Sequence, residues 1–236
     1  MKTYIILSQK TWNNNLVERL QQQFPEHKFI HIATREDFTQ EHLEELNPDK
    51  VFIPHWSYII PEKIWGNFEC VVFHMTDLPY GRGGSPLQNL IVRGHKETKI
   101  SALRVEKGLD MGDIYMKKPL SLYGSAEEIY MRASGIIETM IEEIIQTNPK
   151  PQKQTGEPVE FKRRKAADSD ISGLNDLDSI YDYIRMLDAE GYPNACLTIG
   201  QVKYEFSRVQ QKADGSLVAD VRISKQKIDI CSRVKE

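Results

Sequence analysis

Cysteine is scarce in this chain of 236 residues, and the three that it has form no pattern. Cys70, Cys196 and Cys231 are far apart, odd in number and lack the Cys-x-x-Cys spacing of zinc sites and redox motifs. Neither a disulfide framework nor a zinc site is therefore indicated. This usage is typical of a reducing compartment, and we expect a cytoplasmic protein that holds no metal.

Long hydrophobic runs are also missing. No stretch reaches the roughly 18 apolar residues of a membrane span, and the N-terminal MKTYIILSQKTWNN has only a short apolar run before polar residues. We expect no membrane segment and no targeting signal. The sequence also contains no internal repeat and no low-complexity tract.

An excess of positive charge is missing as well. Lys and Arg number 31 against 34 Asp and Glu, for a net charge of -3. A nucleic acid would have to be held by a local patch, because the whole chain does not attract phosphate, and we expect no nucleic-acid partner. The run KRRK at 162–165 is interpreted as a solvated linker, with contact to phosphates as the alternative.

The first two thirds of the chain alternate between short apolar runs and segments of helical periodicity. The apolar runs are TYIIL (3–7), KFIHIA (28–33), KVFIP (50–54) and CVVFH (70–74). Strands that are apolar on both faces, separated by helices, are typical of parallel sheets. We predict an α/β fold with a Rossmann-like, mostly parallel sheet and helices on both faces.

The last third of the chain has a different organisation. The periodicity of 125–147 predicts a long packing helix, and NPKPQKQTGEP at 148–158 loses all periodicity, which indicates a boundary. A helix at about 176–188 and alternating β segments follow. We predict a catalytic domain at 1–150, a linker at 151–170 and a small, mostly β appendage at 171–236.

Two unusual loops follow strands of the predicted sheet. His74 ends one strand and opens a loop with three glycines and two prolines, and Asp110 and Asp113 lie in the loop GLDMGDIY, 108–115. Loops at the carboxyl ends of strands meet at one edge of a sheet, so we expect His74 and Asp110 to touch. A histidine held by a carboxylate is an acid/base pair. The glycines permit either a close ligand or an ordinary turn.

These loops resemble the N10-formyltetrahydrofolate-dependent formyltransferases. HMTDLPYGRGGSP (74–86) is similar to the family's histidine and Arg-Gly loop, and GLDMGDI (108–114) is similar to its aspartate loop. The resemblance covers about residues 1–150, and FKRRKAADSDI (161–171) resembles a connector of the family. Because the tail is short and VFIPHWSYIIPEKIW (51–65) is similar to their sequences, the chain resembles the sugar N-formyltransferases, nearest to those of pseudaminic acid biosynthesis.

The resemblance implies an enzyme that transfers a formyl group from N10-formyltetrahydrofolate to the amine of a nucleotide-linked, UDP-type amino sugar. His74 would shuttle the proton, Asp110 would orient it, and Thr76 is a candidate donor to the oxyanion. The expected folate-binding residues are Trp56, Leu78, Arg82, Gly83, Gly84, Ser85, Pro86 and Asp113. The expected sugar-nucleotide contacts are Tyr80, Gly81, Arg82 and Arg93.

One position departs from the family pattern. The family motif reads Asn-x-His, and Val72 occupies the asparagine position. That asparagine is taken to stabilise the oxyanion, and losing one such donor costs roughly 2.7 to 4 kcal/mol in barrier height. Protonated His74, the Thr76 hydroxyl and a backbone N–H of the glycine loop are the candidate replacements.

Two other functions stay open. The first is formylation of another amine, such as that of methionyl-tRNA, against which we weigh the low net charge and the short tail. The second is a non-catalytic module on a formyltransferase fold, against which the retained His74 and Asp110 argue. The sequence leaves the oligomeric state open, a homodimer included.

Overall fold

The computed structural model describes residues 1–225, so Cys231 lies outside the described residues. The chain divides into two compact units, which consist of 1–123 with 128–163 and of 124–127 with 164–236. The segment 151–163, predicted as linker, groups with the first unit.

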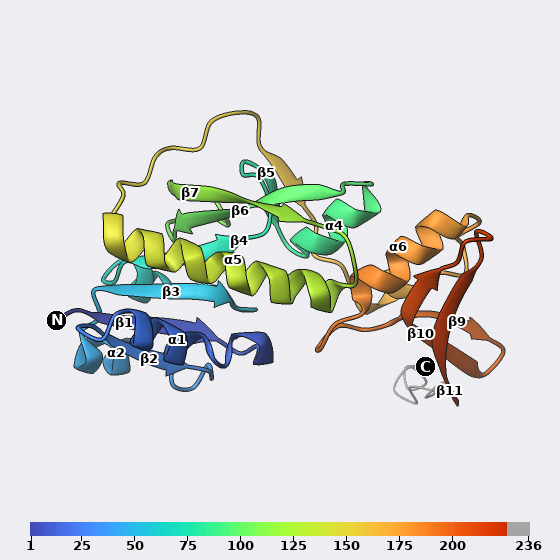
Figure 1. Cartoon of the computed structure of the whole chain (residues 1–236), viewed down its shortest axis with the longest axis horizontal. Coiled ribbons are helices and arrows are strands. Elements are labelled where there is room, and N and C mark those ends of the chain that lie inside the picture. The colour runs from blue at the N-terminus through green and yellow to red at the C-terminus, as the bar shows by residue number, and fades with distance from the viewer. Residues whose placement is uncertain (226–236) are drawn as a thin grey trace, which may run out of the picture. The chain divides into compact units, whose positions relative to one another are not determined.

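The first unit is built on a six-stranded sheet in the order β2-β1-β3-β4-β6-β7 (Figure 1). Neighbouring strands run parallel from β2 to β4, and β6 and β7 are antiparallel additions. The strands are β1 Thr3–Ser8, β2 Lys28–Ile32, β3 Lys50–His55, β4 Cys70–His74, β6 Glu97–Arg104 and β7 Ile114–Ser121. The predicted α/β class with a mostly parallel sheet is confirmed.

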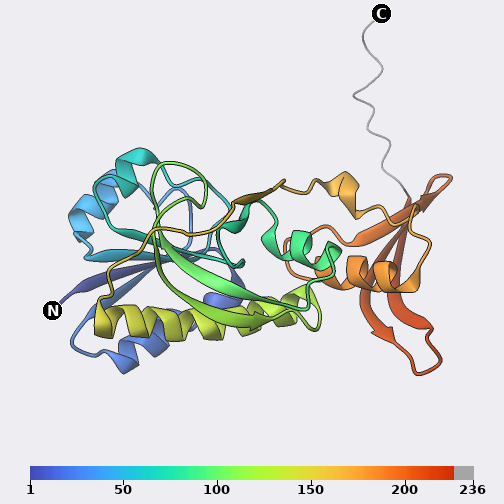
Figure 2. The same ribbon diagram turned by 90° about the horizontal axis from the view of Figure 1, so that it is seen from above.

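Helices cover both faces of this sheet. Figure 2 shows α1 and α5 on one face and α2 and α3 on the other. An ion pair of 2.7 Å between Arg19 and Glu138 joins α1 to α5. The helices are α1 Leu16–Gln23, α2 Gln40–Leu46, α3 Glu62–Trp65, α4 Pro86–Val92 and α5 Ala126–Thr147, with the 3-10 turn η1 Thr11–Asn13 before α1.

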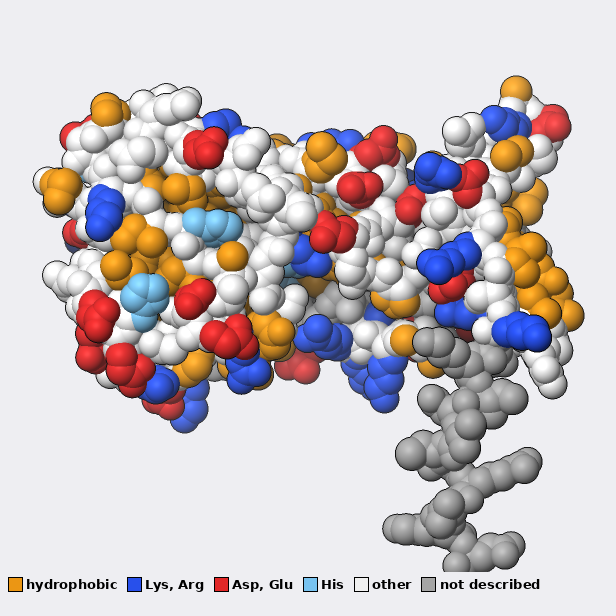
Figure 3. All heavy atoms as spheres, turned by 90° about the horizontal axis from the view of Figure 1, so that it is seen from below, with side chains coloured by type: hydrophobic (Ala, Val, Ile, Leu, Met, Phe, Trp, Pro, Cys, Tyr) orange, Lys and Arg blue, Asp and Glu red, His pale blue; other side chains and the backbone are white. Residues whose placement is uncertain are grey.

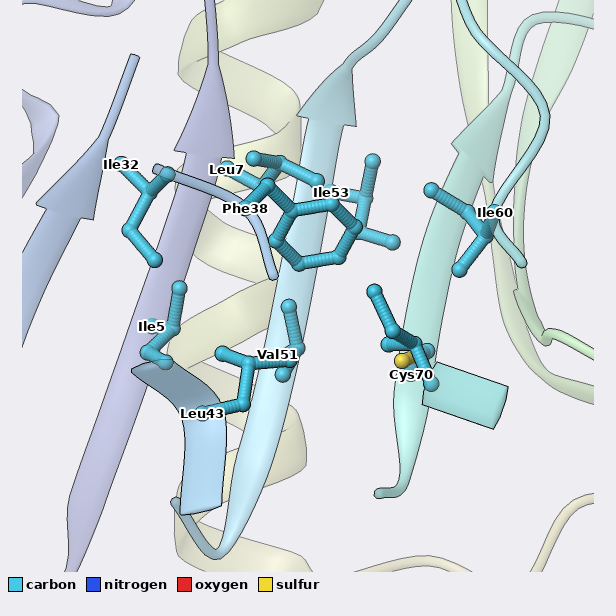
Figure 4. Packing of buried hydrophobic residues seen from close by; sticks show 10 residues of the cluster. Ile5, Leu7, Ile32, Phe38, Leu43, Val51, Ile53, Ile60 and Cys70 are labelled. Carbon is cyan, nitrogen blue, oxygen red and sulfur yellow. The ribbon is translucent and has the colours of Figure 1, made fainter. Parts of the chain in front are cut away.

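The core under α2 and α3 consists of aliphatic side chains from alternate strand positions. Figure 4 shows Ile5 and Leu7 of β1, Val51 and Ile53 of β3 and Cys70 of β4 on one face. Period-two alternation places these residues together, because successive strand side chains point to opposite faces. Burial raises the pKa of the Cys70 thiol to about 12, so this cysteine is a core residue rather than a nucleophile.

A short second sheet lies beside the loop that follows His74. The strand β5 Tyr80–Gly83 pairs in parallel with β8 Val159–Phe161, so the end of the predicted linker forms part of the loop's support. The Gly84 N–H also donates to the carbonyl of Phe161 at 3.1 Å.

The second unit consists of a helix and a three-stranded antiparallel sheet in the order β11-β10-β9. The mostly β appendage is thus present. Its elements are η2 Ala166–Ser169, α6 Leu177–Leu187, β9 Ala195–Ile199, β10 Val202–Gln211 and β11 Leu217–Lys225. None of the helices within residues 1–225 combines the length and the apolar character of a membrane span.

Candidate active site

His74 is the last residue of β4 and is buried, with 8% of its side chain exposed. Its Nε2 lies 2.7 Å from the carbonyl oxygen of Gly81. A carbonyl oxygen only accepts, so Nε2 carries a hydrogen and donates it. The other ring nitrogen, Nδ1, is left facing the aspartate loop.

Asp110 lies beside that nitrogen. The distance from His74 Nδ1 to Asp110 Oδ2 is 3.5 Å, and 11% of the Asp110 side chain is exposed. The same oxygen accepts a hydrogen bond of 2.9 Å from the Gly83 N–H. The structure thus brings together the histidine and the aspartate, as the sequence predicted, at an ion-pair distance longer than an optimal charged hydrogen bond. The expected reason is wrong, because β6, the strand before the aspartate loop, runs antiparallel to β4 and ends beside Val71.

Thr76 is fully buried under the same loop. Its hydroxyl lies 3.4 Å from the Gly81 carbonyl, and its own carbonyl accepts a 2.7 Å bond from the Ser101 hydroxyl. Ser101 in turn accepts from the N–H of Leu78, which is also fully buried. Thr76 and Leu78 therefore shape the loop from inside, and neither presents a surface to a ligand in this conformation.

The three loop glycines are packed against the protein's own chain. A Cβ at Gly81 would lie 2.7 Å from Thr76 and 2.8 Å from Phe161, and one at Gly84 would lie 2.5 Å from Arg163. Gly83 has φ +108° and no room for a Cβ beside the Phe161 carbonyl. The close approach that these glycines allow is thus to residues 161–163, where the sequence suggested a ligand.

The helix α4 that follows is tied to the same segment. The Asn89 Nδ2 donates to the carbonyls of Gly84, Ser85 and Lys162, at 3.0, 3.0 and 2.9 Å. Ser85 has φ +51°, and Pro86 begins α4. Arg93, at the other end of α4, donates to Asn89 and places its guanidinium 4.5 Å from the Phe161 ring centroid. Arg93 is therefore a stacked helix-end residue and does not join the His74 group.

The remaining predicted contacts lie around this centre. Trp56 is half-buried and packs edge-on against Phe38 at 5.8 Å. The Tyr80 hydroxyl lies 3.1 Å from Nε2 of His95. The backbone carbonyl of Asp113 accepts from the Arg104 N–H at 2.9 Å, while its side chain is half-exposed.

Val72 occupies the family's asparagine position two residues before His74, on the same face of β4. Its backbone pairs with Ile53 of β3 and Leu103 of β6, and its half-buried side chain packs against the aliphatic core. The valine thus fills apolar space at this position.

Charged residues anchor the start of the loop. Lys117 Nζ lies 2.5 Å from Asp77 Oδ1, and Lys99 Nζ lies 2.9 Å from Asp77 Oδ2. Burial alone would raise the pKa of Asp77, but hydrogen bonds from the two lysines outweigh it and hold that pKa below its ordinary value. Asp77 therefore stays ionised and ties the loop to β6 and β7.

Another histidine also ends a strand of the sheet. Desolvation within the ring cluster of Trp12 and Tyr130 lowers the pKa of His55 to about 4, with Lys10 acting in the same direction. His55 is thus neutral near pH 7, and its ring packs against the rings of Trp12 and Tyr130.

One side chain of this site was not predicted from the sequence. Gln154 lies in the aperiodic segment 148–158, yet its Nε2 donates to the carbonyls of Asp110 and Gly112, each at 2.8 Å. Its Oε1 accepts from Arg82 at 3.1 and 2.8 Å. Gln154 lies among prolines and lysines in a stretch without periodicity, so the local sequence does not predict these contacts.

A buried histidine beside a carboxylate, at the carboxyl edge of a sheet, defines an acid/base site in an α/β domain. The profile of the family described as Formyl transferase matches residues 5–134, and that of "Methionyl-tRNA formyltransferase, C-terminal domain" matches 166–224. The chain belongs to the Formyl transferase family. This family uses N10-formyltetrahydrofolate, as the sequence resemblance implied.

Individual relatives are named for one substrate. A solved methionyl-tRNA formyltransferase from Clostridium thermocellum is 50% identical, with a TM-score of 0.93 over 95% of this chain and 100% of that one. A methionyl-tRNA formyltransferase from Caldanaerobacter subterraneus is 34% identical over 39% of this chain and 30% of that protein. The chain spans about half the length of the curated relatives it matches, since the first three are covered to 30%, 48% and 60%.

These findings overturn the expected sugar substrate. A sugar N-formyltransferase from a Shewanella species is 16% identical, with a TM-score of 0.64 over 97% of this chain and 99% of that one, a similarity that shows the fold alone. The predicted sugar-nucleotide reaction and its pseudaminic branch are therefore wrong as the main interpretation. A short tail does not distinguish the two substrates, because the solved Clostridium thermocellum chain is covered completely by this one.

Proposed function

We propose that the chain transfers the formyl group of N10-formyltetrahydrofolate to the amine of methionyl-tRNA. The observation that carries this proposal is the 50% identity with the Clostridium thermocellum methionyl-tRNA formyltransferase over 95% of this chain. The match of residues 166–224 to the methionyl-tRNA formyltransferase C-terminal domain supports the same substrate.

The geometry around His74 suits this chemistry. An amine attacks a formyl carbon only when it is neutral, and the tetrahedral intermediate must lose one proton and deliver another to the folate nitrogen. His74 gives its Nε2 proton to the folate nitrogen and takes up the proton that the amine loses, so the ring regains its starting charge. Asp110, 3.5 Å from Nδ1, stabilises the doubly protonated ring that gives the proton. Nε2 has to exchange the Gly81 carbonyl for a group of the reactants during turnover.

Among the candidate donors that would replace the family's asparagine, His74 has the best geometry. The Thr76 hydroxyl is buried and lies 3.4 Å from the Gly81 carbonyl, which His74 Nε2 binds at 2.7 Å. The N–H groups of Gly83 and Gly84 are bound to Asp110 and to the Phe161 carbonyl. We assign the contact with the developing oxyanion to the Nε2 hydrogen of His74, which already binds a carbonyl oxygen.

A tRNA partner requires a local positive surface, since the net charge of the chain is -3. Lys162, Arg163 and Lys165 are exposed neighbours in the sequence, and residues 161–163 also pack on the glycine loop. On the face shown in Figure 3, Lys and Arg side chains lie among Asp and Glu side chains. Phosphate binding therefore depends on where the cationic side chains lie, and the net charge of the chain does not report their positions.

A substrate panel tests the proposal. The protein is incubated with isotopically labelled N10-formyltetrahydrofolate and with tRNA charged with methionine, and the released amino acid is weighed by mass spectrometry. We expect labelled formylmethionine, and none from tRNA charged with N-acetylmethionine, which has no free amine. Free methionine tests whether the tRNA is needed. Formylation of a nucleotide-linked amino sugar without formylation of methionyl-tRNA would overturn the proposal.

We also predict that turnover survives exhaustive treatment with a chelator. Attack of a neutral amine on an activated formyl group needs proton transfer, which His74 supplies, rather than a Lewis acid. The check is the initial rate before and after chelation with EDTA, followed by removal of the chelator. Loss of activity that one added divalent metal restores would contradict this prediction.

A further inference from the structure

The segment 148–158 runs along the aspartate loop. The N–H and carbonyl of Gln152 exchange hydrogen bonds of 2.9 and 2.8 Å with Ile114, the first residue of β7. This bridge places Gln154, two residues later, at the half-buried position between the aspartate loop and Arg82 of the glycine loop.

The Gln154 amide uses both of its ends there. Nε2 supplies its two hydrogens to the carbonyls of Asp110 and Gly112, and Oε1 accepts from Nε and Nη2 of Arg82. A guanidinium only donates and a carbonyl only accepts, so the orientation of the amide is determined by its partners. A glutamate at this position could only accept hydrogen bonds and a lysine could only donate them, so neither could bind both the two carbonyls and Arg82.

The aspartate loop needs such support. Asp110 has φ +53°, a left-handed conformation that aspartate tolerates better than most residues but that is still uncommon, so contacts with its surroundings help to maintain it. Gln154 binds the carbonyl of Asp110 itself, while the Asp110 carboxylate binds the Gly83 N–H. Arg82 and Gly83 are adjacent, so both contacts join the aspartate loop to one short stretch of the glycine loop.

We propose that Gln154 is a positioning residue, which with Arg82 sets the place of the Asp110 carboxylate relative to the His74 imidazole. The expected effect of Gln154 on turnover rests on the proposed function, whereas its effect on the position of Asp110 does not. Arg82 then serves as a connector between the loops, in place of the folate or phosphate contact that the sequence suggested. A displacement of a catalytic group by about 1 Å can lower a rate roughly 100-fold, so even a modest shift of Asp110 is measurable.

The first test needs no substrate. The Gly83 amide reports on Asp110, to which it donates, and its hydrogen exchange is measured by NMR in the parent, in Gln154→Ala and in Gln152→Ala. We expect exchange at least roughly tenfold faster in Gln154→Ala, as for an amide that loses its acceptor. Gln152→Ala should leave it unchanged, because that side chain is exposed and shows no hydrogen bond within residues 1–225. Unchanged exchange in Gln154→Ala overturns the inference, whatever the enzyme's substrate is.

The second test is kinetic. Gln154→Ala should lower kcat for methionyl-tRNA roughly 10- to 100-fold with little change in KM, as expected when a positioned catalytic group is displaced. In an Asp110→Asn background the same change should have almost no further effect, since both act through one carboxylate. Full additivity of the two changes would show that Gln154 acts elsewhere.

Gln154→Glu separates the two ends of the amide. It keeps the acceptor for Arg82 and loses both hydrogen bonds to the carbonyls of the aspartate loop. We expect kcat as low as in Gln154→Ala, and this variant also serves if the alanine variant does not fold. Activity within twofold of the parent in Gln154→Glu would show that holding Arg82 is the whole role of Gln154, and would overturn the proposal.

Discussion

Replacing His74 or Asp110 by asparagine is expected to lower turnover by two or more orders of magnitude while leaving the fold intact. Loss of general acid/base catalysis costs roughly 100- to 10,000-fold. Asn at 74 cannot shuttle a proton, and Asn at 110 can still accept from the Gly83 N–H but carries no charge to stabilise the imidazolium. Single-turnover rates of formyl transfer and thermal melting curves measure the two parts of this prediction.

The matched control for this pair is His42→Asn. His42 lies on α2, and its Nδ1 lies 2.8 Å from the Asp37 carbonyl oxygen. His42→Asn thus removes a histidine that also contacts a backbone carbonyl, but outside the His74 site. Its turnover should equal that of the parent. Activity within tenfold of the parent in both His74→Asn and Asp110→Asn would remove these residues from the catalytic assignment.

Val72→Asn is expected to destabilise the protein and to leave turnover no higher. The half-buried side chain at 72 packs against aliphatic residues of the core, so an amide there would lose part of its hydration without gaining a prepared partner. Such burial costs about 1 to 3 kcal/mol of unfolding free energy. Urea denaturation and turnover, measured side by side, test both statements.

Val72→Ala is the control that separates lost packing from a buried amide. It removes the two methyl groups and adds no polar atom, so a larger loss of stability in Val72→Asn than in Val72→Ala isolates the cost of the amide. A stable Val72→Asn variant at least tenfold faster than the parent would show that the site lacks a useful donor. Our assignment of the oxyanion contact to His74 would then be wrong.

The low net charge was a weak argument against a tRNA substrate. Net charge is a sum over the whole chain, and the affinity of a protein for phosphates depends on the few cations that reach them. Lys162, Arg163 and Lys165 are exposed in a protein whose net charge is -3, and the sum hides them. Tail length was an equally weak guide, because the Clostridium thermocellum relative is no longer than the stretch it shares with this chain.

The sequence by itself determined the local features of this protein. Short, continuous apolar runs became β1, β3 and β4, the periodic stretch at 125–147 became α5, and the glycine and proline loop began at His74. These predictions succeeded because the periodicity of a strand or helix, and the φ values that glycine permits, are properties of residues close together in the chain. The meeting of His74 with Asp110 was predicted from a rule for parallel strands that does not hold here. β6, the strand before the aspartate loop, runs antiparallel to β4 and ends beside Val71, and the loop at 105–113 brings Asp110 back to His74.

Only the tertiary structure decided which residues support that pair. Gln154 contacts a loop 42 to 44 residues earlier and an arginine 72 residues earlier, and β8 pairs with β5 across a similar separation. A residue larger than glycine does not fit at 81, 83 or 84, because Thr76, Phe161 and Arg163 occupy the space beside these positions. No periodicity or composition encodes such contacts, because a side chain's hydrogen-bond partners depend on where the folded backbone brings distant segments, and that is set by the packing of the whole unit.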